Sequence, residues 1–129
     1  MKIIRINDSS EFDSTVSQAV LDNPTSHVFV LLFGTEEPQT GESWCPDCVI
    51  ADPVVRRHIS KIPDSILIEV PVGPRLEFRK PDNFYRNHKS LNLTAIPTLY
   101  LWKQSGPAKS LVEVECADES KWAEFVKEL

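Results

Sequence analysis

Residues 44–48 read Trp-Cys-Pro-Asp-Cys, and this stretch decides how the rest of the chain is interpreted. Two cysteines three positions apart occur both in redox-active dithiols and in zinc sites, so the spacing alone is ambiguous. The flanking sequence favours the dithiol. Residues 27–33 form an apolar run typical of a strand buried on both faces. Apolar residues then recur at helical spacing over residues 49–62, which predicts a helix directly after the motif.

Zinc is the main alternative, because a structural zinc ion takes four ligands and the motif could supply two of them. The further candidates are scattered singly along the chain and form no second pair: His27, His58, His88 and Cys116. We therefore expect no metal site. Two buried, unreactive cysteines are the other alternative, but the Trp, Pro and Asp around them favour a turn that reaches the surface.

Strands and helices alternate outward from the motif. Apolar and β-branched runs predict strands at residues 2–6, 27–33, 65–72, 99–102 and 111–114. Helical periodicity predicts helices from Asp8 to residue 23, from the motif to Pro63, over 82–90, and from Asp118 or Ser120 onward. Alternation first and a hairpin last predict a three-layer α/β fold, a central mixed β-sheet flanked by helices. The 129 residues suit a single domain, 1–129.

Composition narrows the partners and the compartment. The net charge is −5 and the pI is near 5.2, which disfavours nucleic acid or an anionic membrane as a partner. The N-terminal residues hold no apolar run long enough for a signal peptide or a membrane span. The chain has three cysteines, an odd number that does not suggest a secreted disulfide framework. We expect a cytoplasmic protein, and we expect it to be a monomer.

The thiol chemistry follows from the predicted helix start. Cys45 falls at the helix N-terminus, where unpaired backbone N–H groups and the helix dipole stabilise an anion. Its pKa should fall from about 8.5 to about 6–7.5, so that its thiolate attacks a substrate disulfide and Cys48 then displaces the product. Pro46 suits the first helical turn, which needs no N–H there. Asp47 should tune the thiol pKa and the redox potential, in a direction left open because its charge and its position act oppositely.

The motif and two other segments resemble the thioredoxin fold. These segments are residues 33–34 (Phe-Gly), after the buried strand, and residues 96–98 (Ile-Pro-Thr), before a later strand. The chain is most similar to the branch of small cytosolic thioredoxin-related proteins with a Trp-Cys-Pro-Asp-Cys site. The resemblance implies that Pro97 is cis and faces the dithiol. It also implies that Trp44, Ile96 and Pro97 border the groove in which an extended disulfide substrate binds.

The same resemblance implies a function. Members of the branch are disulfide reductases that take electrons from NADPH-dependent thioredoxin reductase and favour small or exposed disulfides such as cystine. They accept narrower substrates than thioredoxin, and no cofactor is expected. The loop at residues 34–43 is long and would line the site. This loop and the unusual Asp47 motivate an alternative, a redox-sensitive signalling or scaffold module that binds a partner and rarely turns over.

Two further residues stand out under the resemblance. When the chain is aligned on residues 33–34, Leu32 occupies the place of a buried Asp that thioredoxin carries beneath the dithiol. That proton acceptor is therefore absent here or relocated, for example to Asp47. Cys116 matches a cysteine of the branch, and we expect it to be a buried structural thiol, as free cysteines often are.

Overall fold

The computed structural model describes residues 1–127 and residue 129, and its centre is a five-stranded sheet. The strands are β1 (Lys2–Arg5), β2 (His27–Phe33), β3 (Ser65–Pro71), β4 (Thr98–Lys103) and β5 (Gly106–Val112). Their order across the sheet is β1-β3-β2-β4-β5. β3 runs parallel to β1 and β2, whereas β4 runs antiparallel to β2 and β5. The sheet is therefore mixed, as predicted.

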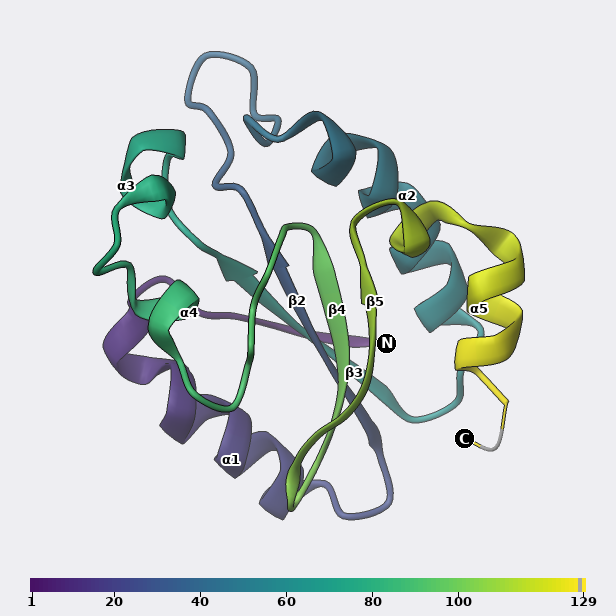
Figure 1. Ribbon diagram of the computed structural model, residues 1–129. Helices are drawn as coiled ribbons and strands as arrows, with labels where there is room; N and C mark the ends of the chain where they lie inside the picture. The colour runs from purple at the N-terminus through teal and green to yellow at the C-terminus, as the bar shows by residue number, and fades with distance from the viewer. Residues whose placement is uncertain (128) are drawn as a thin grey trace.

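Helices cover both faces of this sheet (Figure 1). α1 (Phe12–Asp22) lies on one face, while α2 (Pro46–Ser60) and α5 (Glu119–Phe125) lie together on the other. The shorter elements are the 3-10 helices η1 (Ser9–Glu11) and η2 (Glu113–Ala117) and the helices α3 (Arg75–Arg79) and α4 (Phe84–Asn87). This arrangement confirms the predicted three-layer α/β fold.

The middle strand β2 carries the chain to the motif. Every residue of β2 after His27 is buried, because β3 and β4 pair with its two edges and helices cover its two faces. A strand in this position can be apolar throughout, as predicted for residues 27–33. β1 and β2 are parallel but not neighbours, since β3 lies between them. After Phe33 the loop at residues 34–43 leads from the end of β2 to the start of α2.

The C-terminal hairpin differs from the prediction. β5 begins at Gly106 and ends at Val112, so a strand at 111–114 is wrong in its second half. Glu113 has a φ of 53°, in the left-handed region, and its N–H donates to the Pro97 carbonyl at 2.7 Å. This contact turns the chain out of the sheet and into η2.

The helices begin where the capping residues predict, with one omission. Asp8 accepts from the Ser10 N–H at 2.9 Å and caps η1, which leads into α1. Asp118 caps α5 in the same way. The helix predicted over 82–90 is reduced to the four residues of α4. α3 was not predicted, because a five-residue helix is too short to establish an apolar period.

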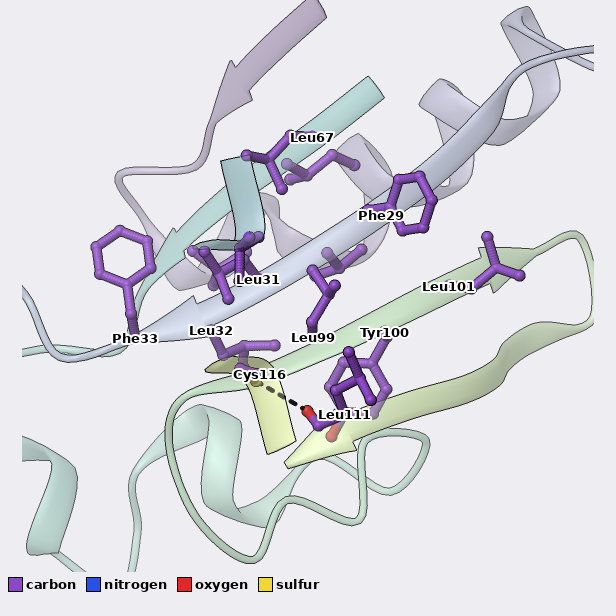
Figure 2. Packing of buried hydrophobic residues seen from close by; sticks show 14 of the residues in the cluster. Phe29, Leu31, Leu32, Phe33, Leu67, Leu99, Tyr100, Leu101, Leu111 and Cys116 are labelled. Carbon is purple, nitrogen blue, oxygen red and sulfur yellow. Dashed lines mark hydrogen bonds between the residues drawn. The ribbon is translucent and has the colours of Figure 1, made fainter. Parts of the chain in front are cut away.

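Cys116 lies in the core, beside Leu111 of β5 (Figure 2). It is fully buried, and its thiol donates to the Leu111 carbonyl at 3.3 Å. The indole N–H of Trp122, also fully buried, donates to the Cys116 carbonyl at 2.7 Å. Burial raises the pKa of the Cys116 thiol to about 12. These contacts confirm the predicted buried structural thiol.

Candidate active site

The two cysteines of the motif lie at the first turn of α2, as predicted. Cys45 is the N-cap residue and Pro46 occupies the first helical turn. Cys45 Sγ accepts from the Cys48 backbone N–H at 3.3 Å, the type of bond by which a cap satisfies a free N–H. Both thiols are free and nearly buried, with exposed fractions of 6% for Cys45 and 4% for Cys48.

The pKa of Cys45 is lowered to about 7, within the range expected from the sequence. The main cause is the hydrogen bond that the Cys48 thiol donates to Cys45 Sγ, and the Cys48 backbone N–H adds to it. Asp47 acts in both directions: its carboxylate raises the pKa of Cys45 by charge repulsion, while its backbone N–H lowers it. The sequence left open whether the Asp47 side chain raises or lowers the pKa of Cys45, and its carboxylate raises it.

The Cys48 thiol behaves oppositely. Its pKa is raised, first because it donates to Cys45 and second because it is buried. The backbone of Gly34 and the hydroxyl of Ser43 partly offset this rise. At neutral pH about half of Cys45 is therefore thiolate, while Cys48 keeps its proton. This is the division of labour that a nucleophile and a resolving thiol require.

Pro97 closes one side of the dithiol. The Ile96-Pro97 peptide is cis, as the resemblance implied. The Ile96 carbonyl lies 3.8 Å from Cys45 Sγ, so this loop does face the Cys45 thiol. The Pro97 carbonyl points inward, where the Glu113 N–H donates to it. The structure therefore brings Ile96 and Pro97 to the dithiol, where a substrate groove was predicted.

Trp44 forms a second side. Its indole N–H donates to the Gly73 carbonyl at 2.8 Å. The guanidinium of Arg75 lies 4.8 Å above the ring and also donates to the Trp44 carbonyl. A Cβ at Gly34 would stand 2.6 Å from the indole, so only glycine fits beneath the ring. Arg75 was not predicted as a site residue; a Gly-Pro pair followed by a charged segment could have indicated the short helix that positions it.

The loop at residues 34–43 forms the third side. Glu36 and Ser43 form a bridge across the loop, and Arg5 on β1 pairs with the Glu36 carboxylate at 2.7 Å. The Ser43 hydroxyl accepts from the Cys45 N–H at 3.1 Å. The loop therefore lies against the dithiol, and a cavity of about 220 Å³ remains between it, α2 and β2. Cys48 forms part of the wall of this cavity.

Leu32 does not lie beneath the dithiol, where the alignment on residues 33–34 had placed it. Leu31 and Phe33 line the cavity beside Cys48, and because side chains alternate along a strand, Leu32 points to the opposite face. No acid of β2 lies beneath the dithiol. The buried acid on this face is Glu69 of β3, paired with Leu31 in register and held by the guanidinium of Arg56.

No group of three or more metal-binding side chains occurs among residues 1–127 and 129, so the dithiol has no third ligand there. No described helix is long and apolar enough to cross a membrane. The remaining candidates for zinc ligands are distributed over other elements: His27 on β2, His58 on α2, His88 beside α4, and Cys116 in η2.

Comparison with known proteins agrees with this geometry. Residues 5–128 match the family model described as thioredoxin domain-containing protein 17-like, thioredoxin domain. The chain belongs to this family. Thioredoxin domain-containing protein 17 of Mus musculus is 35% identical over 113 residues, covering 85% of this chain and 82% of the mouse protein. The thioredoxin-like protein Clot of Arabidopsis thaliana is 39% identical over 75 residues, covering 57% of this chain and 56% of Clot.

Solved structures agree on the fold. Oxidized thioredoxin O1 of Arabidopsis thaliana superposes with a TM-score of 0.64 at 19% identity, over 100% of this chain and 98% of the other. Membership in the thioredoxin domain-containing protein 17-like family, together with this fold, makes the chain a thioredoxin-like redox protein.

Proposed function

We propose that the protein is a disulfide reductase that works by thiol–disulfide exchange through Cys45 and Cys48. One observation carries the proposal: a thiol with a pKa of about 7 accepts a hydrogen bond from a second thiol whose own pKa is raised. This pair stands at a helix start and faces the cis peptide before Pro97. The family membership supports the same class of activity.

The reaction consists of two exchanges. The Cys45 thiolate attacks one sulfur of a disulfide R–S–S–R′, forming a bond between Cys45 and the R half, while R′–S⁻ leaves and takes a proton from solvent. Cys48 then gives its proton to water and attacks Cys45 Sγ, which closes the Cys45–Cys48 disulfide and releases R–S⁻, and this thiolate takes up a proton from solvent. Two electrons pass from the dithiol to the substrate. Thioredoxin reductase would return two electrons from NADPH.

The neighbouring residues take supporting roles in this scheme. Trp44 would provide an apolar shoulder of the groove, and the Ile96 carbonyl would be available to an extended substrate once the Cys45 thiol is deprotonated. Pro46 and Asp47 would set the pKa of Cys45 and the redox potential of the pair. No metal or cofactor enters the scheme.

We further propose a substrate range narrower than that of thioredoxin, limited to cystine and exposed disulfides. The loop at residues 34–43 supports this restriction, since its ion pair with Arg5 holds it beside the dithiol and leaves only a small cavity. The protein would act as a single-domain monomer in the cytoplasm, where reductase and NADPH keep dithiols reduced.

The test is a coupled assay. Protein, thioredoxin reductase, NADPH and cystine are mixed, and NADPH consumption is followed together with the release of cysteine. We expect turnover that is lost in Cys45→Ser, and a mixed disulfide that accumulates in Cys48→Ser. A Cys45→Ser protein with wild-type turnover would overturn the proposal.

A redox-sensitive binding module is the second candidate, favoured by the ordered loop that narrows the site. It predicts a protein partner whose affinity depends on the Cys45–Cys48 disulfide while turnover of cystine stays negligible. The coupled assay separates the two, because only the reductase consumes NADPH catalytically.

A further inference from the structure

The cavity beside Cys48 has a chemical character that the dithiol chemistry does not require. Its apolar side is formed by Leu31 and Phe33 of β2 and by Val49 of α2. The Cys48 thiol and Pro97 also lie in its wall, so the cavity borders the dithiol on the side of Cys48. Its volume of about 220 Å³ is enough for a short substituent on one half of a small disulfide.

The polar side of the cavity is predominantly acidic. Three carboxylates line it, from Glu36, Glu42 and Asp52, against one guanidinium, from Arg56. Arg56 is itself shared between Asp52 and the buried Glu69.

The charges behind the cavity do not reverse this balance. Arg5 pairs with both Glu36 and Glu69. Behind the cavity wall, Arg5 therefore adds one positive charge and Glu69 adds one negative charge. Glu42 makes no ion pair within the part of the chain that the structure describes. The cavity and the charged groups in contact with it therefore carry an excess of two negative charges at neutral pH.

We propose that this cavity makes the reductase selective for disulfides that carry an ammonium group close to sulfur, as cystine does, and that it disfavours disulfides whose only charged groups are carboxylates. The proposal rests on the reductase function proposed above. The substituent's methylene groups would lie against Leu31 and Phe33, and its ammonium group would face Glu42 and Asp52. Charge complementarity and charge repulsion then discriminate between substrates of the same size.

The chemical step is the exchange already described, and only the position of the substituent is new. The Cys45 thiolate attacks the sulfur of one half and the other half leaves as a thiolate. The half that stays bonded to Cys45 places its aminoethyl group in the cavity until Cys48 displaces it. The cationic Arg75 lies on the Trp44 side, where it would favour the opposite charge.

The test uses three disulfides of matched length. These are cystamine, which carries two ammonium groups, neutral hydroxyethyl disulfide, and dithiodipropionate, which carries two carboxylates. Pre-reduced protein is mixed with each in a single turnover, and every rate is divided by the rate with dithiothreitol to remove intrinsic reactivity. We expect cystamine to exceed hydroxyethyl disulfide by about fivefold at low ionic strength, with dithiodipropionate slowest. The preference should fall below about twofold near 0.5 M salt.

Variants locate the source of the preference. Glu42→Gln should lower the ratio of cystamine to hydroxyethyl disulfide by about twofold, and Glu42→Gln with Asp52→Asn should lower it further. Glu124→Gln removes one negative charge from α5, where Glu124 pairs with Lys127, and should keep the wild-type ratio.

Different outcomes would contradict the charge selectivity alone or the reductase function as well. If the neutral disulfide is reduced but the three normalised rates are equal, or dithiodipropionate is fastest, the selectivity is wrong and the reductase stands. If no disulfide is reduced, both proposals fail. If Glu124→Gln lowers the ratio as much as Glu42→Gln, net charge acts and the cavity does not.

Discussion

Cys45 and Cys116 are two buried thiols whose pKa values this fold shifts in opposite directions. Cys45 is 6% exposed and Cys116 is fully buried. The pKa of Cys45 falls to about 7, whereas that of Cys116 rises to about 12. Burial opposes ionisation at both sites, so burial does not explain the difference.

The difference lies in the hydrogen bonds that the two sulfur atoms accept. Cys45 Sγ receives hydrogen bonds from the thiol and the backbone N–H of Cys48, at the open end of a helix. The Cys116 thiol is mainly a donor, to the Leu111 and Pro97 carbonyls, whose oxygens would repel an anion. In this fold, hydrogen-bond donors to the sulfur atom lower the pKa of a thiol, and solvent exposure is not needed.

The largest expected effect is on turnover, which should require Cys45 but not Cys116. Cys45→Ser should abolish NADPH-dependent reduction of cystine, because no second thiol is ionised at neutral pH. Cys116→Ala should retain turnover but lower the free energy of unfolding by about 1–2 kcal/mol, because it leaves a small cavity in the core. Coupled assays and denaturant titrations measure the two effects. Loss of turnover in a folded Cys116→Ala protein would contradict the separation.

The second effect is a difference in alkylation. At pH 7 about half of Cys45 is thiolate, against about one part in 100,000 of Cys116. Iodoacetamide should therefore label Cys45 first, with a rate that rises with pH and is half-maximal near pH 7, not near the ordinary value of about 8.5. Mass spectrometry of the reduced native protein locates the label. In urea both residues should react alike, and early labelling of native Cys116 would contradict the assignment.

Much of the fold could be predicted because its signals are local. The apolar run at 27–33 and the helix after the motif each follow from residues adjacent in sequence. The end of β5 could not be predicted in this way, because Glu113 leaves the sheet to reach the Pro97 carbonyl, a partner distant in sequence. The order of β1, β3 and β2 is likewise a property of long-range pairing.

The site divides similarly. Cys45, Pro46 and Cys48 could be placed at the helix start because capping depends on immediate neighbours. The contact between Arg75 and Trp44 depends on α3, whose five residues give no periodic signal. The side of β2 that faces the dithiol was misplaced by one residue, because alignment on residues 33–34 cannot fix which face of a strand is turned inward.

The third effect concerns the donor itself. Cys48→Ala removes the thiol that contributes most to the low pKa of Cys45, and the pKa should rise by about one unit. Cys48→Ser keeps an O–H donor at the same place and should leave the pKa closer to 7. The ultraviolet absorbance of the thiolate, followed against pH in the Cys116→Ala background, measures both. Equal pKa values in the Ala and Ser variants would show that the backbone N–H groups dominate.

The smallest effect isolates the Asp47 carboxylate. Its charge raises the pKa of Cys45 while its own backbone N–H lowers it, and Asp47→Asn removes only the charge. The pKa of Cys45 should therefore fall by about 0.3–0.5 unit at low ionic strength. Because the interaction is between charges near solvent, the difference between the two proteins should shrink as salt is added. A lowered pKa places more thiolate on Cys45 at neutral pH, so alkylation of Asp47→Asn should be slightly faster below pH 7 and equal at high pH. A rise in the pKa would mean that the carboxylate stabilises the helix start more than it repels the thiolate.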